Sequence, residues 1–196
     1  MRRLRKKAGF SLSETMLALL IVALLSMSIA TGVAFGARQY RRAMARSEAR
    51  ILCSSLAGII QEELRNTTGV QTDGDDLEFF QSTHYQSGTE LSSLVVIVEE
   101  DGEEKEQDEG YVAVKTGDEY FLLLGEAAYS GANDLKAKLD SVKCNTYEKE
   151  IDDGSKTEVY LSSFSVSLVI KARGAGEVRS DFDVIPLNEI KISAGT

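Results

Sequence analysis

The sequence is poor in the residues that build most catalytic and metal centres. It has one histidine (His84), two cysteines, one proline and no tryptophan. One histidine and two scattered cysteines are poor material for a zinc site or a cysteine–histidine pair. Cys53 and Cys144 allow either one disulfide in an exported domain or two unpaired thiols, and the sequence leaves both alternatives open.

Basic residues are scarce over most of the chain, which has 22 Lys and Arg against 31 Asp and Glu. Five of the basic residues lie in the first nine positions, which contain no acid: Arg2, Arg3, Arg5, Lys6 and Lys7. Removing these five from the 22 leaves 17 basic residues against 31 acids, a net charge of −14. Such an acidic body repels nucleic acid, so we expect no nucleic-acid binding by the folded domain.

Charge is absent from Thr15 to Ala37, a run of 23 residues. A helix needs about 20 apolar residues to cross the hydrocarbon core of a bilayer, so this run predicts a membrane-spanning helix. A cleavable secretory signal has an apolar region of about 7–15 residues followed by a small-residue cleavage site. An ordinary signal peptide is therefore the weaker interpretation.

The residues just before this run carry the most specific pattern in the chain. Gly9-Phe10-Ser11-Leu12-Ser13-Glu14 follows a short basic leader and precedes the apolar run. This arrangement resembles the processing motif of type IV prepilins. The resemblance implies cleavage after Gly9 by prepilin peptidase, N-methylation of Phe10, and an assembly role for Glu14 as the fifth residue of the mature chain. Serine stands at position 11 where threonine is more usual, and the apolar run lacks the proline that often kinks this helix.

The same resemblance implies a filament subunit, more specifically a minor pilin or pseudopilin. The filament is a type IV pilus, a type II secretion pseudopilus or a DNA-uptake (competence) filament. The implied partners are prepilin peptidase, other pilin-like subunits through the N-terminal helix, and an inner-membrane assembly platform. The implied location is the cell membrane as a single-pass protein with a cytoplasmic N-terminus and an extracytoplasmic head, and later the filament.

Five arginines follow the apolar run: Arg38, Arg41, Arg42, Arg46 and Arg50. Because basic residues flank both ends of the run, counting them does not orient the span, and the family motif alone places the N-terminus in the cytoplasm. The arginines either pair with acidic bodies of neighbouring subunits or form a solvated helix face.

The rest of the chain predicts an α+β fold, a long helix packed on an antiparallel sheet. Apolar residues recur at helical spacing on one stripe up to Arg65: Tyr40, Met44, Ile51, Leu52, Leu56, Ile59, Ile60 and Leu64. Strands are predicted at 91–98, at 111–115 and 120–124 as a hairpin, at 157–172 with a bend near Ser162, and at an edge position at 178–184. We expect a cleaved leader at 1–9, a transmembrane or filament-core helix at 10–37, an amphipathic helix at 38–66 and a β-rich head at 67–196.

Other candidate sites are weak. The turn Asp73-Gly74-Asp75-Asp76 has calcium-ligand chemistry but lacks a full calcium loop, so an acidic surface turn is preferred. The acidic run 101–109 is interpreted as a solvated or mobile loop, and Gly174-Ala175-Gly176 lacks the partners of a phosphate loop. We predict no cofactor, no metal site and no enzyme activity.

Two other functions compete with the filament subunit. The first is a single-pass, membrane-anchored extracytoplasmic binding or sensor domain that keeps its basic leader. The second is a secreted hydrolase behind an atypical signal peptide, which the missing catalytic residues argue against.

Overall fold

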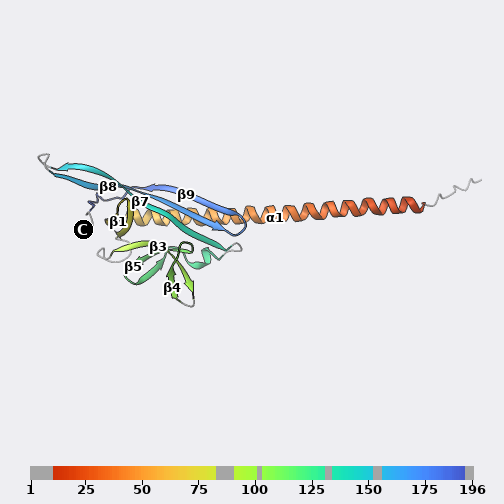
Figure 1. Cartoon of the computed structure of the whole chain (residues 1–196), viewed down its shortest axis with the longest axis horizontal. Coiled ribbons are helices and arrows are strands. Elements are labelled where there is room, and N and C mark those ends of the chain that lie inside the picture. Colours follow the sequence, from red (N-terminus) through yellow and green to blue (C-terminus); the bar gives the residue numbers. More distant parts are fainter. Residues whose placement is uncertain (1–10, 83–90, 101–102, 131–133, 152–155, 193–196) are drawn as a thin grey trace, which may run out of the picture. The chain divides into compact units, whose positions relative to one another are not determined.

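The computed structural model describes residues 11–82, 91–100, 103–130, 134–151 and 156–192. The chain divides into two compact units, Met1–Ala43 and Met44–Thr196. One helix, α1 (Leu12–Arg65, 54 residues), begins in the first unit and ends in the second (Figure 1). The helix predicted from Phe10 to Arg65 is thus confirmed over the described residues, and Phe10 lies outside them.

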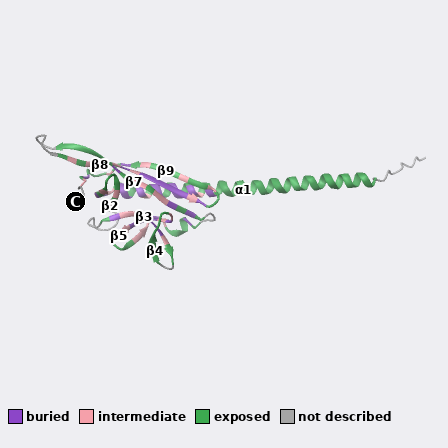
Figure 2. Ribbon diagram, in the orientation of Figure 1, coloured by how far each residue is buried: buried purple, intermediate pink, exposed green. Residues whose placement is uncertain are grey.

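In the first unit, every described side chain is exposed (Figure 2). They include the apolar residues of the uncharged run, such as Leu19, which is 70% exposed, and Phe35, which is 61% exposed. The run contains no proline, so nothing removes a backbone hydrogen bond from this part of α1.

In the second unit, one face of α1 packs into the core of the head. Its buried residues recur three or four positions apart and are Ala45, Ala49, Leu52, Cys53, Leu56, Ala57, Ile60, Glu63 and Leu64. The predicted stripe is partly wrong, because Met44 is 49% exposed and Ile51 is 64% exposed. Next to Met44 the buried position is Ala45, and in the turn before Ile51 it is Ala49. A search for large apolar residues at helical spacing does not detect these alanines.

In the described residues, nine strands form one antiparallel sheet, which together with α1 is the predicted α+β fold. The strands are β1 (Thr67–Asp73), β2 (Asp76–Ser82), β3 (Ser92–Glu100), β4 (Glu103–Glu106), β5 (Tyr111–Thr116), β6 (Glu119–Leu122), β7 (Leu135–Ile151), β8 (Lys156–Ala172) and β9 (Gly176–Val184). A 3-10 turn, η1 (Glu126–Ala128), follows β6. The order across the sheet is β6-β5-β3-β2-β7-β8-β9, with β1 paired to β2 and β4 paired to β3.

Several predicted strands are confirmed. The hairpin β5–β6 turns tightly, with Thr116 opposite Glu119, and β9 is at one end of the strand order. The predicted bend in 157–172 is a bulge at Ser162, because Asn145 of β7 lies opposite Ser163 while Thr146 lies opposite Leu161.

Other expectations were incomplete or wrong. The acidic run 101–109 was interpreted as a loop, but its residues Glu103–Glu106 form β4 and pair with β3, although their side chains are exposed as expected. Strands β1, β2 and β7 were not predicted. Residues 152–155, between β7 and β8, lie outside the described residues.

The core of the head joins α1 to the sheet. Leu56, Ile60, Phe80, Phe164 and Leu168 are fully buried in one cluster. At its side, the buried hydroxyl of Tyr129 accepts a hydrogen bond from the Val112 N–H at 3.1 Å. Burial raises the pKa of Tyr129 to about 12. This core holds residues 45–64 of α1 on the sheet.

Candidate processing and assembly site

The first turn of α1 is closed by a reciprocal pair of hydrogen bonds between Ser11 and Glu14. The Ser11 N–H donates to Glu14 Oε2 at 3.0 Å, and the Glu14 N–H donates to Ser11 Oγ at 3.4 Å. This geometry is a capping box, which gives partners to amides that the start of a helix otherwise leaves unbonded. It also holds the carboxylate at the positive end of the helix dipole.

The capping box leaves part of the Glu14 carboxylate available. An ionised carboxylate has two oxygens with about four acceptor positions. Within the described residues, Oε2 accepts from Ser11, whereas no hydrogen bond or ion pair is found at Oε1. The acid can therefore keep its bond to Ser11 and accept a second donor.

The helix that follows is suited to an apolar environment. Within the described residues, α1 is the one helix long and apolar enough to cross a membrane, with an 18-residue window of mean hydropathy 2.4. Its hydroxyl groups bond to its own backbone: Thr15 to the Leu12 carbonyl at 2.8 Å, Ser26 to Val22 at 2.8 Å and Thr31 to Met27 at 3.0 Å. Internal hydrogen bonds of this kind reduce the cost of placing polar groups in hydrocarbon.

The two residues at the expected cleavage point, Gly9 and Phe10, lie outside the described residues. The structure therefore places Glu14 and its partner Ser11 and says nothing of the expected cleavage point.

Cys53 and Cys144, which the sequence left as either a disulfide or two thiols, are both free and buried. Burial raises the pKa of Cys53, and a hydrogen bond with Ser180 opposes this effect. Burial raises the pKa of Cys144 to about 11, with a smaller contribution from the nearby carboxylates of Asp76 and Asp75. Both thiols are therefore poor nucleophiles in the folded head.

The remaining candidates belong to turns. Asp73-Gly74-Asp75-Asp76 joins β1 to β2, with Gly74 at a φ of 63°, and Gly174 and Gly176 adopt φ values of 79° and 87° between β8 and β9. Within the described ranges, no group of three or more His, Cys, Asp or Glu residues is placed to hold a metal ion. His84 lies outside those ranges.

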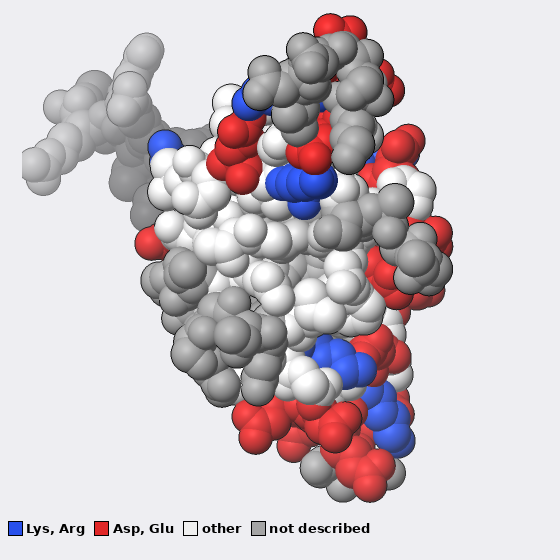
Figure 3. Space-filling view, turned by 90° about the vertical axis from the view of Figure 1, so that its left-hand side faces the viewer, with Lys and Arg blue, Asp and Glu red and all other residues white. Residues whose placement is uncertain are grey.

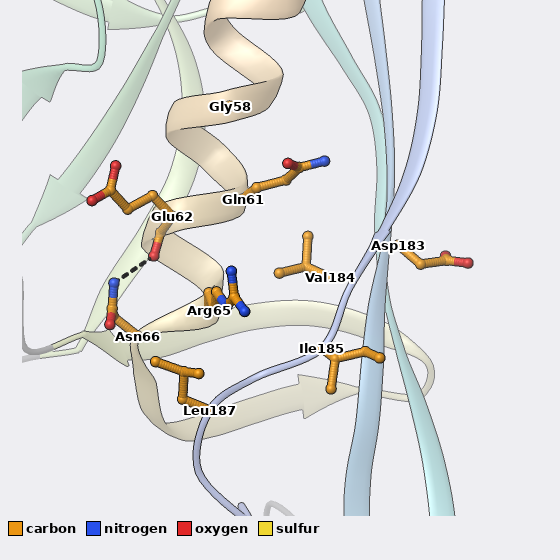
Figure 4. Close-up of a pocket in the computed structure, with 9 residues that line it drawn as sticks. All are labelled: Gly58, Gln61, Glu62, Arg65, Asn66, Asp183, Val184, Ile185 and Leu187. Atoms are coloured by element: carbon orange, nitrogen blue, oxygen red, sulfur yellow. Dashed lines mark hydrogen bonds between the residues drawn. The ribbon is translucent and has the colours of Figure 1, made fainter.

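A groove that the sequence did not predict lies in the head between the C-terminal turn of α1 and the chain after β9. Its volume is about 650 Å³, and its nine lining residues include Arg65, Val184 and Leu187 (Figure 4). The Leu187 N–H donates to the Arg65 carbonyl at 2.9 Å, which closes one end of it. The described residues that line the groove include no serine, cysteine or histidine, so they offer no nucleophile with a base.

Comparison with known proteins places the resemblance at the N-terminus. The family model of the prokaryotic N-terminal methylation motif matches residues 4–30, which include the capping box and the first half of the apolar run. No curated protein and no solved structure matches the chain. The motif implies processing by prepilin peptidase and assembly with other pilin-like subunits, and together with the apolar helix it supports membrane anchoring. The family that it defines is structural rather than enzymatic, and the match supports identification of this chain as a type IV pilin-like protein.

Proposed function

We propose that this chain is a minor pilin or pseudopilin, a structural subunit of a type IV pilus, a type II secretion pseudopilus or a competence filament. It is made as a single-pass membrane precursor with its N-terminus in the cytoplasm and its head outside. Prepilin peptidase cleaves after Gly9 and methylates Phe10. An inner-membrane platform then moves the mature chain into the filament through its N-terminal helix, and the chain performs no catalysis of its own.

One observation carries this proposal: a carboxylate is fixed at the first turn of an exposed apolar helix, four residues after the expected new chain end. Glu14 is held there by Ser11, with Oε1 open to a second donor. An uncompensated acid inside a membrane costs about 2.5–3.5 kcal/mol at the centre of a span. This cost favours a state in which the acid has a cationic partner.

Cleavage after Gly9 supplies that partner. It creates an ammonium group at the head of the apolar helix, and N-methylation keeps its positive charge. In a bundle of such helices, the ammonium of one subunit pairs with Glu14 of its neighbour, and the low dielectric strengthens the attraction. The pairing requires a stagger between neighbours, so it sets the register of assembly as well as its energy.

The proposal is tested in the native cell by comparing strains with active and inactivated prepilin peptidase. We expect the mature chain in the sheared filament fraction of the first strain. The second strain should hold only the longer precursor, in its membranes. A chain of identical length in both strains, retained in the membrane, would support the anchored binding or sensor domain instead.

A further inference from the structure

Among the described residues, two surfaces of opposite charge in the head have no ionic partner. The first is formed by Arg46 and Arg50, four residues apart on the part of α1 that belongs to the head, and is called here the arginine row. The second is the pair Glu99 and Glu104, which lie directly opposite each other on β3 and β4 and are called here the glutamate pair. All four side chains are exposed.

The arginine row carries like charges at the spacing where helix side chains are neighbours. Residues four apart on a helix lie about 5–6 Å apart at Cβ, and like charges in this relation destabilise the helix. Within the described residues, no salt bridge relieves the row.

The glutamate pair shows the same unfavourable arrangement on a sheet. Directly opposite residues of an antiparallel pair have Cβ atoms about 4.5–5.5 Å apart, and like charges there are destabilising. The next pair toward the end of this hairpin is also two glutamates, Glu100 opposite Glu103. Figure 3 shows acidic side chains gathered at the lower end of the head, the end at which Figure 1 places β4.

Two lysines lie near the glutamate pair. Lys105 follows Glu104 directly on β4, so its side chain points to the opposite face of the strand. Lys115 pairs with Glu106 at 2.6 Å, and this contact lowers the pKa of Glu106. Across the described chain, no salt bridge reaches Glu99, Glu100, Glu103 or Glu104. The glutamate pair therefore has no cationic partner among the described residues.

We propose that the glutamate pair of one copy docks on the arginine row of a second copy of this chain. The spacing of two opposed glutamates is close to the spacing of the two arginines of the row, so each carboxylate can meet one guanidinium in a two-bond fork. The contact relieves like-charge repulsion on both surfaces at once.

The two surfaces differ, so each copy keeps one surface free after docking. A contact of this type is heterologous, and it extends to a further copy only where the rotation between copies does not close a ring. The inference rests on the proposed filament function and adds to it that two copies occupy neighbouring positions, held by their heads as well as by Glu14.

Charge inversion of the full chain in its own cell tests this docking. The variants are E99K/E104K, R46E/R50E and the quadruple variant that combines them. D118K/E119K is the matched control, because it makes the same charge change at exposed residues of another hairpin, β5–β6. The readout is the ratio of mature chain in sheared filaments to mature chain in the membrane.

Like charges brought together across an interface oppose binding strongly, so each double variant should lower this ratio at least about tenfold. The quadruple variant should return close to wild type, and the control should stay there. The docking is wrong if E99K/E104K behaves like the control. It is also wrong if the quadruple variant assembles as poorly as R46E/R50E, because the arginines then serve another partner, such as anionic lipid.

Failure of the filament function itself gives a different result. In that case the wild-type chain is absent from the filament fraction or keeps its leader, which rejects both proposals. Normal processing and assembly of the wild type together with normal assembly of E99K/E104K rejects the docking alone.

Discussion

Glu14 has two roles in this account, and one substitution separates them. As part of the capping box it accepts a hydrogen bond from Ser11, and as a charge it is proposed to pair with the ammonium group of a neighbouring subunit. Glutamine at the same position keeps the capping contact, because a capping box accepts Glu or Gln three residues after the serine. Glu14→Gln therefore removes the charge and little else.

The two roles differ in size. A single hydrogen bond of the capping type contributes about 0.5–1.5 kcal/mol. Removing one member of a buried ion pair costs about 3–5 kcal/mol, because the other charge stays buried without compensation. Since about 1.4 kcal/mol corresponds to a factor of ten, Glu14→Gln should lower incorporation at least about a hundredfold.

The assay is the ratio of mature chain in sheared filaments to mature chain in membranes, measured by immunoblot. Ser11→Ala is the matched control, because it removes the hydroxyl of the cap and keeps the acid. We expect processing of both variants, assembly of Ser11→Ala close to wild type, and retention of Glu14→Gln in the membrane. Wild-type incorporation of Glu14→Gln would refute the pairing and leave the acid only its capping role.

Three further predictions concern processing, backbone packing and the thiols. Replacing Gly9 by a bulky residue should leave full-length precursor in the membrane, as judged by its mobility on a gel. Gly110→Ala should destabilise the head by about 1–3 kcal/mol in thermal unfolding of the detergent-solubilised chain, because a Cβ there would lie 2.1 Å from a backbone carbonyl oxygen of β3. Gly58→Ala, where a Cβ meets nothing within 4 Å on an exposed helix position, should instead stabilise it by about 0.5–1 kcal/mol. Cys53 and Cys144 should resist alkylation at pH 8 in the folded protein, and the rate for Cys144 should rise as the pH approaches its pKa of about 11. Both thiols should react once the protein is unfolded, and rapid labelling of the folded chain would contradict their burial.

Much of the helix and part of the sheet could be predicted from the sequence, because local patterns decide them. The absence of proline and the run of apolar residues account for α1, and the sequence around Gly117 and Asp118 accounts for the turn between β5 and β6. The change of phase in the alternation near Ser162 also predicted the bulge in β8. In each case the signal lies within a few neighbouring residues.

The parts that were not predicted depend on distant partners. Residues Glu103–Glu106 are all charged and have low strand propensity, yet they form β4 because β3 offers a hydrogen-bonding edge. Much of β7 is polar and exposed, and its strand conformation follows from its long pairing with β8. These strands result from tertiary pairing that overrides local preference.

The candidate site was predicted in part. Glu14 stood out because a charge at the start of an apolar run is unusual. The Ser11–Glu14 capping box was overlooked, although a serine three residues before a glutamate at a helix start is its sequence signature. The alanines at positions 45 and 49 were missed for a different reason, since small residues give a weak periodic signal even where they are fully buried.

The central claim is most directly tested by mass spectrometry of the N-terminus of the protein recovered from its own cells with an active prepilin peptidase. The account predicts a chain that begins with N-methylated Phe10. A chain that still carries the basic residues Arg2 to Lys7 would contradict it.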